Sequence, residues 1–532
     1  MKQQEFQLPE IPESEQTPLV QELLLVILEQ QKRIRELGEE IEKLKGHKGK
    51  PRLRASQMDK QERKAKEERK PGPKKSKTGE LEIHEEQVIA PRELPENPRA
   101  QGWRFKGYND FVVQELRLDT RNIRYRLEEW QGPNGEYLKG KLPESVSGHY
   151  GAWLKSYVLY EHHHQRVTQP LLLQQLREWG IRISSGQLNN LLIEGKAVFH
   201  EEKAQLLETG LQVSNHIHVD DTGARHKGKN GYCTHIGNEL FAWFESTQSK
   251  SRENFLGLLR VGSKDYVVNV GALEYMALNK LPKGKLELLE EGKSFPDEQT
   301  WKNYLEGLGI TGSRHIRIAT EGALMGCILA RGLSEDMGIM SDDAGQFNIF
   351  RHALCWIHAE RNINKLVPLN DTHAKHIHWV RSQIWDLYAA LKAYKMDKSL
   401  QTPTFQEEIR ARFDEMCRTR TDYATLNGHL KRLATNKTEL LRVLDDPSLP
   451  LHNNLSERDI REYVYRRKIS GSTRSDEGRR CRDTFASLKK TCRKLDIPFW
   501  DYLYDRVSNT NAFAPLPETI RARASPTAVV CS

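Results

Sequence analysis

The stretch "HIHVDDTGARHKGKNGYCTHIG", residues 216–237, decides the fold, because it places two aspartates at the end of an alternating apolar pattern. Ile217 and Val219 alternate with histidines, which is the period of a half-buried strand. The dipeptide "TG" is expected to turn the chain, and "YCTHIG" and "ELFAWFEST" predict two further strands. Asp220 and Asp221 are therefore either turn-forming residues, since Asp before Thr-Gly is ordinary turn chemistry, or ligands of a metal ion.

The length and cysteine content restrict the class of protein. A chain of 532 residues predicts several domains rather than one core. Its seven cysteines are scattered and include no Cys-x-x-Cys pair, which indicates neither a disulfide framework nor a zinc ribbon. No signal peptide is recognisable, and no apolar run approaches the roughly 18 residues of a membrane span. We therefore expect a soluble protein of a reducing compartment.

The positive charge of the chain is concentrated in one stretch. The net charge is +9, and residues 48–78 alone hold thirteen Lys or Arg and four acidic residues. Such a stretch favours binding to a polyanion, in the first place nucleic acid, although a solvated linker has the same composition. The lysines that we expect to contact DNA phosphates are Lys70, Lys74, Lys75 and Lys77.

The segment before this stretch, residues 1–47, has the heptad pattern of a coiled coil. Its a positions are Val20, Ile27, Ile34 and Ile41, and its d positions are Leu23, Gln30, Leu37 and Leu44. β-Branched residues at a with leucine at d favour a parallel two-stranded coil. We expect a homo-oligomer, most simply a dimer, although a single amphipathic helix docked on its own protein has the same pattern.

Residues 167–195, "VTQPLLLQQLREWGIRISSGQLNNLLIEG", predict two helices joined by a tight turn. Pro170 suits the first turn of a helix, Gly180 permits the turn, and Ser184 or Ser185 can cap the second helix. This is the pattern of a DNA-binding helix-turn-helix, and also of a plain helical hairpin.

Three more acidic residues lie at the ends of predicted secondary structure downstream. The apolar run at residues 337–340 ends in Asp342 and Asp343, as the first strand ends in its aspartate pair. Glu457 lies in the first turn of a predicted helix, where Asn454 as N-cap would make it a capping-box residue. The same helix continues with basic residues that suit contact with phosphates: Arg458, Arg461, Arg466, Arg467 and Lys468.

Two aspartates at strand ends and a glutamate that opens a basic helix can converge on a pair of divalent cations. Mg²⁺ prefers hard oxygen ligands and keeps several waters, so that three carboxylates and a substrate phosphate suffice. Two such ions activate a water or a 3′-hydroxyl and stabilise the leaving oxygen of an in-line displacement.

Five motifs in this order resemble the DDE transposases of the insertion sequence 66 family. They are "HVDDTGAR", "SDDAGQF", "CWIHAERN", "NNLSERDIR" and "RRKISGS". Carried over by position, Asp220, Asp342 and Glu457 match the catalytic and metal-binding triad of the family, whereas Asp221 stands where the family has glutamate. The resemblance therefore favours Asp220 as a metal ligand over its role in a turn.

The resemblance implies an α/β fold with an RNase H-like catalytic core, a mixed sheet with helical insertions, preceded by the coiled coil and the helix-turn-helix. It implies Mg²⁺ or Mn²⁺ as cofactor and double-stranded DNA, the transposon ends and the target, as partner, and it leaves room for accessory transposition proteins. It also implies a bacterial cytoplasmic protein associated with the nucleoid.

The expected domain organisation follows the motifs along the chain. It comprises a coiled coil (1–47), a basic linker (48–80), an unassigned region (81–150), the helix-turn-helix region (151–209), a first core segment (210–262), a mainly helical insertion (263–335), a second core segment (336–369), a helical insertion (370–450), a third core segment with the glutamate (451–510) and a tail (511–532). The 121 residues between Asp220 and Asp342 exceed the usual spacing of the family, which leaves the choice between Asp342 and Asp343 open.

The remaining metal-binding residue types form no convincing site. Cys355 and His358 lack a second pair of ligands, and no cysteine precedes Cys233, so we expect no structural zinc of the ribbon type. The resemblance places His358 and Arg361 close to the carboxylates, in an accessory role such as contact with DNA. The histidine runs at 162–164 and 372–378 are expected to be packed or exposed rather than metal-bound.

These observations predict a transposase that cleaves transposon ends and transfers the freed strand into target DNA. One alternative is a dimeric DNA-binding regulator without catalysis, a decayed or domesticated transposase. Another is a structure-specific nuclease on the same fold, which would cleave strands without joining them.

Overall fold

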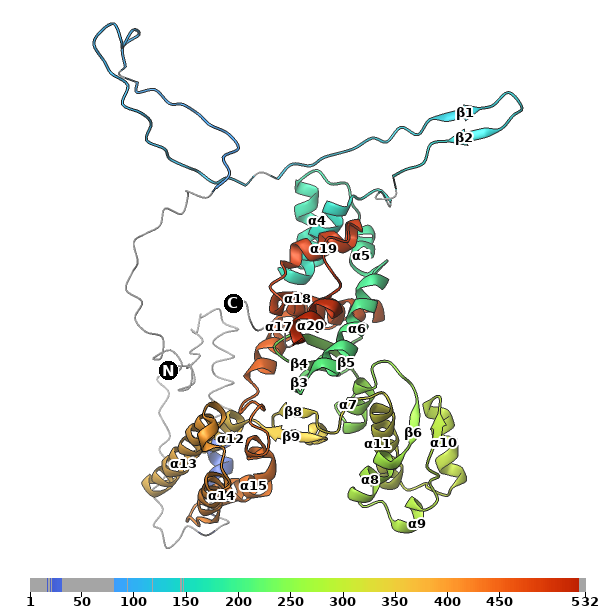
Figure 1. Cartoon of the computed structure of the whole chain (residues 1–532), viewed down its shortest axis with the longest axis vertical. Coiled ribbons are helices and arrows are strands. Elements are labelled where there is room, and N and C mark those ends of the chain that lie inside the picture. Colours follow the sequence, from blue (N-terminus) through green and yellow to red (C-terminus); the bar gives the residue numbers. More distant parts are fainter. Residues whose placement is uncertain are drawn as a thin grey trace. The chain divides into compact units, whose positions relative to one another are not determined.

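The computed structural model describes residues 17, 20, 22–30, 81–92, 94–116, 118–143, 146 and 148–525 (Figure 1). Val20 and residues 22–30 are helical, and the positions of the predicted coiled-coil seam after Gln30 lie outside the described residues. The basic linker at 48–80, with its four candidate DNA-binding lysines, also lies outside them. The chain divides into two units, Val26–Asn122 and a larger one made of Met1–Leu25 and Ile123–Ser532.

The described residues of the smaller unit beyond residue 80 contain turns and extended chain, with neither helix nor strand. The part of the larger unit from Ile123 on begins with a short hairpin, β1 (Glu129–Gln131) and β2 (Tyr137–Lys139), whose two strands are antiparallel and exposed. The sequence pattern predicts no element for this region.

A five-stranded mixed sheet forms the centre of the larger unit, in the order β5-β4-β3-β8-β9. Its strands are β3 (His216–Gly223), β4 (Tyr232–Gly237), β5 (Ala242–Thr247), β8 (Gly338–Ser341) and β9 (Arg351–Leu354). β4 is antiparallel to both β3 and β5, whereas β8 is parallel to both β3 and β9. The prediction of an α/β fold with a mixed sheet is therefore confirmed.

Helices precede the sheet along the chain. They are α3 (Ala152–Leu159), the π-helix η2 (Tyr160–His164), α4 (Gln169–Glu178), α5 (Ser185–Ile193) and α6 (Ala197–Val213). The two helices predicted over 167–195 are present, and Gly180 between them has a φ of +79°, which a residue with a side chain rarely adopts. Ser184 and Gln187 form a capping box: the Ser184 hydroxyl accepts from the Gln187 N–H at 3.1 Å, and the Gln187 side chain accepts from the Ser184 N–H at 3.0 Å.

The segment between β5 and β8 is mainly helical, with one small sheet. It contains α7 (Arg252–Leu259), β6 (Tyr266–Val268), α8 (Val270–Leu278), α9 (Lys283–Leu286), β7 (Lys293–Phe295), α10 (Glu298–Gly307) and α11 (Ser313–Ala330). The antiparallel pair β6–β7 was not expected from the sequence. Trp301, which is fully buried, packs its ring on Tyr266 of β6 and Phe295 of β7 and so joins α10 to this pair.

Helices also fill the segment between β9 and the glutamate helix. They are α12 (Trp356–Asn364), α13 (Asp371–Met396), α14 (Pro403–Arg418), α15 (Ala424–Thr435) and α16 (Lys437–Leu440), with the short 3₁₀ turns η4 (Lys398–Leu400) and η5 (Arg442–Leu444). Their apolar faces form a hydrophobic core of their own. Trp356 connects this core to the sheet, because it follows β9 closely and donates from its indole N–H to the Leu440 carbonyl at 2.8 Å.

Four helices complete the described chain: α17 (Asn454–Ser470), α18 (Asp476–Lys494), α19 (Phe499–Ser508) and α20 (Leu516–Ala524). No helix in the described ranges is both long and apolar enough to cross a membrane.

Helix α18 covers the open edge of the sheet through hydrogen bonds as well as packing. The backbone N–H groups of Ala242, Phe244 and Ser246 in β5 donate to side chains of α18 at 3.1, 2.9 and 2.8 Å. The acceptors are Thr491, Ser487 and Asp483, spaced four residues apart. Four helical residues rise about 6.0 Å and two strand residues about 6.6 Å, so the two repeats nearly match. The edge strand thus has its donors occupied without a further strand.

Candidate active site

Both aspartates of the opening stretch lie inside β3 and not in a turn. Asp220 pairs with His235 and Asp221 with Thr234 of β4, and the pairing continues to Gly223. The prediction of a turn at Thr-Gly is therefore wrong, because cross-strand pairing with β4 overrides the local turn propensity of that dipeptide.

The prediction of a half-buried alternation in β3 also needs correction. His218, expected on the exposed side, is only 2% exposed. Its Nδ1 lies 3.0 Å from Oδ1 of Asn453, the residue just before α17, and the amide of Asn453 also donates to the Val219 carbonyl at 2.7 Å. Helix α17 thus packs over this face of β3, and Asn453 connects the start of the helix to the strand.

Asp220 and Asp221 differ in the donors that their carboxylates meet. Asp221 accepts from the Thr234 hydroxyl at 2.6 Å and from the Gln346 amide at 2.9 Å. Gln346 belongs to the 3₁₀ turn η3 (Gly345–Phe347), just after β8. The Asp220 carboxylate accepts through Oδ1 from the N–H of Asp221 at 2.8 Å. Both oxygens of Asp221 are consequently held by side-chain donors, whereas Asp220 has more capacity for another ligand.

The strand register brings Asp342 beside Asp220. In the parallel pair, Ile217 lies opposite Ile339 and His218 opposite Met340, and the same offset continued by two residues joins Asp220 to Asp342. Burial, and after it the charge of Asp342, raise the pKa of Asp220 to about 7. The two carboxylates therefore share one electrostatic environment, where β8 ends beside the middle of β3.

Asp343 has different surroundings. Its carboxylate forms an ion pair with Arg432 of α15, whereas Asp342 accepts from the N–H of Ala344 at 3.2 Å. The two neighbouring side chains thus have separate partners, and of the two it is Asp342 whose charge raises the pKa of Asp220.

Glu457 is not the residue of a capping box. Helix α17 begins at Asn454, its N-cap is Asn453, and no side chain caps it, so the prediction of Asn454 as N-cap is wrong by one residue. The Glu457 carboxylate instead faces α12, where Arg361 Nη1 lies 2.8 and 3.1 Å from its two oxygens and His358 Nδ1 lies 3.6 Å away. Its charge also contributes to raising the pKa of Asp220, after burial and the two aspartates.

The structure thus gathers Asp220, Asp342 and Glu457, from β3, the end of β8 and α17, in one electrostatic neighbourhood. Their oxygens do not form a closed ligand set: within the described ranges, the group with ligand atoms all within 4.8 Å is a different one, His216, His218 and Glu239. The guanidinium of Arg361 lies beside Glu457 and neutralises part of the negative charge there.

The basic residues of α17 separate into two groups. Arg458, Arg461 and Lys468 are exposed, as a contact surface for phosphates requires. Arg467 is half-buried and donates to the Thr222 hydroxyl at 3.2 Å, so that it also supports the end of β3. Arg466 does not face solvent as the sequence suggested, because it donates to the carbonyl of His162 in η2.

The histidine runs hold packed side chains together with the exposed His378. His163 stacks on Phe485 with ring centroids 4.1 Å apart, and His164 stacks on Tyr160 at 4.5 Å. His373 stacks on Tyr423 at 4.4 Å. Cys355 is buried and accepts from the N–H of Asn453 at 3.2 Å, so its role is in packing.

Sequence reasoning missed two residues that position this site, Asn453 and Gln346. Asn453 orients His218 and the start of α17, and Gln346 holds Asp221. Both residues belong to motifs quoted above, "NNLSERDIR" and "SDDAGQF". Their positions close to the acidic residues of these motifs are the signal that could have identified them.

Comparison with known proteins gives two matches. Residues 329–480 match the model of the transposase IS66 family, a range that includes β8, β9, α12 and the helix with Glu457. An uncharacterized protein, y4jO, of Sinorhizobium fredii is 41% identical over 324 residues, which is 60% of this chain and 100% of the relative.

Proposed function

Because the chain belongs to the transposase IS66 family, we propose that it is a DDE transposase, which cleaves DNA at transposon ends and joins the freed 3′-hydroxyl to target DNA. The observation that carries the proposal is the register between β3 and β8, which brings Asp342 beside Asp220, together with the packing on β3 of α17, the helix that carries Glu457. The order and directions of the strands in the main sheet, three antiparallel strands followed by two that run parallel to β3, are those expected of an RNase H-like core.

The residues present fit a divalent cation of the hard type. The three carboxylates offer oxygen donors, which Mg²⁺ or Mn²⁺ prefers. Burial, and after it the charge of Asp342, raise the pKa of Asp220, and a bound cation would favour its ionised form. A pair of such ions supplies activation of a water or 3′-hydroxyl and stabilisation of the leaving oxygen. The role of the chain itself is to hold the carboxylates at fixed positions on two strands and one helix.

Asp342 rather than Asp343 is the second ligand in this proposal. Asp343 is paired with Arg432, whereas Asp342 interacts with Asp220 across neighbouring parallel strands. Asp221, held by Thr234 and Gln346, supports the strand end instead of binding the ion.

Arg361 serves as the counter-ion of Glu457 until a metal ion binds. Changing Arg361 to Gln is expected to tighten Mn²⁺ binding by several-fold, because a competing cation is removed, and to weaken cleavage of DNA. Titration calorimetry with Mn²⁺ measures the first effect and a cleavage assay the second. Arg381→Gln, on α13 and paired with Glu360 at 2.7 Å, is the matched control. An unchanged Mn²⁺ affinity in Arg361→Gln would contradict this role.

DNA binding is assigned in this proposal to segments outside the carboxylate site. They are the helix-turn-helix formed by α4 and α5, the basic linker at 48–80, and the exposed residues Arg458, Arg461 and Lys468 with Arg467 beside them. Self-association through the coiled coil at 1–47 would bring two such modules together, as pairing of two transposon ends requires. Action on DNA would associate the protein with the bacterial nucleoid.

Neutralising the linker lysines Lys70, Lys74, Lys75 and Lys77 to glutamine is expected to weaken DNA binding to the same degree for every sequence. Contacts to phosphates do not depend on the DNA sequence. With fewer of them, the slope of the logarithm of the binding constant against the logarithm of the salt concentration becomes shallower, by about one unit per lysine lost. Fluorescence anisotropy at several salt concentrations, with end and unrelated DNA, measures both. A loss confined to one DNA sequence would contradict the assignment.

The proposed function is tested by incubating the protein with labelled end DNA, target DNA and Mg²⁺. A transposase is expected to give both cleaved and joined products, and none after chelation of the metal. A structure-specific nuclease would give cleaved products alone. A regulator would bind the DNA and leave it intact, which would overturn the proposal.

A further inference from the structure

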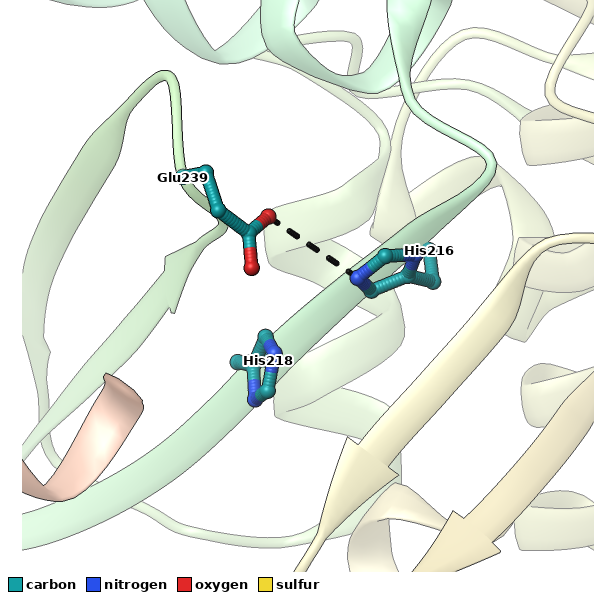
Figure 2. A group of neighbouring side chains, drawn as sticks. All are labelled: His216, His218 and Glu239. Atoms are coloured by element: carbon teal, nitrogen blue, oxygen red, sulfur yellow. Dashed lines mark ion pairs between the residues drawn. The ribbon is translucent and has the colours of Figure 1, made fainter. Parts of the chain in front are cut away.

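Two histidines and a glutamate converge at the start of β3, separate from the three carboxylates. Figure 2 shows His216 and His218 on the strand and Glu239 in the turn between β4 and β5. One ligand atom of each lies within 4.8 Å of the other two, and His216 Nε2 is 3.9 Å from Glu239 Oε2. We propose that these three side chains bind a transition-metal ion, with Zn²⁺ as the best match, in a site that holds the sheet together.

The register of the sheet explains the convergence. His216 and His218 are two residues apart and therefore point to the same face of β3. His218 lies opposite Gly237 of β4, and the same antiparallel register continued by two residues places Glu239 opposite His216. The three ligands are thus neighbours along and across one strand pair.

The turn that carries Glu239 is fixed by its own hydrogen bonds. The side chain of Asn238 accepts from the N–H of Leu240 at 2.9 Å and donates to the Ser214 hydroxyl at 2.7 Å. The Lys494 ammonium donates to the Asn238 carbonyl at 2.5 Å. Ser214 lies just before β3, so that the turn and the start of the strand are joined before any ion binds.

His218 has the partner that a metal-binding histidine usually has. The side-chain NH₂ group of Asn453 donates to the Val219 carbonyl. The side-chain oxygen of Asn453, which lies 3.0 Å from His218 Nδ1, is thus left as an acceptor. Nδ1–H of His218 therefore donates to this oxygen, and Nε2 keeps its lone pair for an ion.

The donor set selects the ion. Two imidazole nitrogens, one carboxylate and a water form the common four-coordinate set of Zn²⁺. Mg²⁺ prefers oxygen ligands and is disfavoured by two nitrogens, so the two sites differ in the metal they take. The Glu239 side chain is 67% exposed and that of His216 19%, which leaves an open path from solvent. The charges of Lys395 and Asp446, which have opposite signs, also act on His216 and offset each other in part.

An ion at this site would stabilise the carboxylate site indirectly. It would join the β4–β5 turn to β3, the strand that carries Asp220 two residues after His218. Through Asn453 it would also hold the start of α17, the helix with Glu457. We therefore expect the melting temperature of metal-stripped protein to rise on addition of Zn²⁺.

The test measures metal uptake by full-length protein without a polyhistidine tag, stripped with a chelator and then titrated with Zn²⁺. Co²⁺ serves as the spectroscopic probe, because its visible absorption reports four-coordinate nitrogen and oxygen ligation. The background carries Asp220→Asn and Glu457→Gln, which removes ligands from the carboxylate site. We expect one tight ion per chain in this background, and a loss of affinity of at least about tenfold in His216→Ala and in Glu239→Gln.

Matched controls are His378→Ala on α13 and Glu201→Gln on α6, which are exposed and lie outside the group. Both are expected to bind Zn²⁺ as the background does. The exposed position of Glu239 makes Glu239→Gln the informative variant if His216→Ala does not fold. Equal uptake in Glu239→Gln and the background, or no stoichiometric uptake in the background, would overturn the proposal. Because no readout involves DNA cleavage, such a failure leaves the proposed function untouched.

Discussion

Changing Asp220 or Asp342 to asparagine is expected to lower the rate of strand cleavage on the order of 10³-fold or more, since loss of a ligand from a metal site removes several kcal/mol of transition-state stabilisation. Binding of end DNA should stay within a few-fold, because separate segments of the chain provide it in this proposal. A labelled end substrate with Mg²⁺ measures cleavage and joining, and a gel shift in the presence of chelator measures binding.

The neighbouring aspartates are the matched controls for these two variants. Asp343→Asn removes an ion pair with Arg432, and Asp221→Asn alters the contacts with Thr234 and Gln346. Both changes should be milder than those of the proposed ligands. A greater loss in Asp343→Asn than in Asp342→Asn would move the second ligand by one residue.

Glu457→Gln is expected to abolish cleavage as well, with little loss of stability. The capping alternative predicts a cost of about 1 kcal/mol and full activity, but the carboxylate faces Arg361 and His358 rather than a backbone N–H at the start of α17. Full activity of Glu457→Gln would refute the triad.

The second large effect concerns stability. Changing Asp459 to asparagine is expected to lower the free energy of unfolding by about 3–5 kcal/mol, the usual cost of removing one partner from a buried ion pair. The Asp459 side chain is 10% exposed and lies 2.8 Å from the Lys494 ammonium and 3.6 Å from that of Lys490. Its loss leaves these two lysines, which are 13% and 11% exposed, without this counter-charge.

The effect of this substitution should depend on pH in a defined direction. Burial by itself would raise the pKa of Asp459, but the hydrogen bond and charge of His235 and the charge of Lys494 outweigh it, so the pKa lies below its ordinary value of 3.8. A lowered pKa contributes stability that is present above pH 3.8 and is lost as the pH falls below it. The difference between wild type and Asp459→Asn should therefore shrink in acid.

Urea unfolding followed by circular dichroism, at neutral pH and at about pH 3, measures both effects. Asp386→Asn is the control, because Asp386 is an exposed aspartate in the middle of α13. Equal unfolding midpoints for Asp459→Asn and Asp386→Asn would show that the lysines find other partners.

Several elements could be predicted from the sequence because local patterns determine them. The strands β4 and β5 and the helices α4 and α5 follow alternation, apolar periodicity and capping residues. The candidate ligands Asp220, Asp342 and Glu457 followed from ordered motifs. The sequence could not predict that Asp220 and Asp342 lie side by side, because the register between β3 and β8 joins residues separated by 121 positions.

The errors arose where local signals were ambiguous or were overridden by distant contacts. Thr222 and Gly223 have turn propensity, but β4 pairs with both. In the sequence, Asn453 and Asn454 are equally suitable as the N-cap residue of α17. The contact of Asn453 with His218 selects Asn453. Arg466 belongs to the same basic run as its neighbours, but its position on the helix directs its side chain toward His162.

The amino-acid sequence by itself determined the strands β4 and β5, the helices before the sheet, and the types and order of the acidic residues, since each depends on propensity and periodicity within a short segment. The mixed α/β class was implied by the resemblance to the family. Tertiary structure alone decided which aspartate of each pair faces the other, that Arg361 neutralises Glu457, and that α18 satisfies the N–H groups of β5. These arrangements depend on contacts between elements far apart in the chain, for example between Ser246 and Asp483, whose positions differ by 237, and no local signal encodes such a contact.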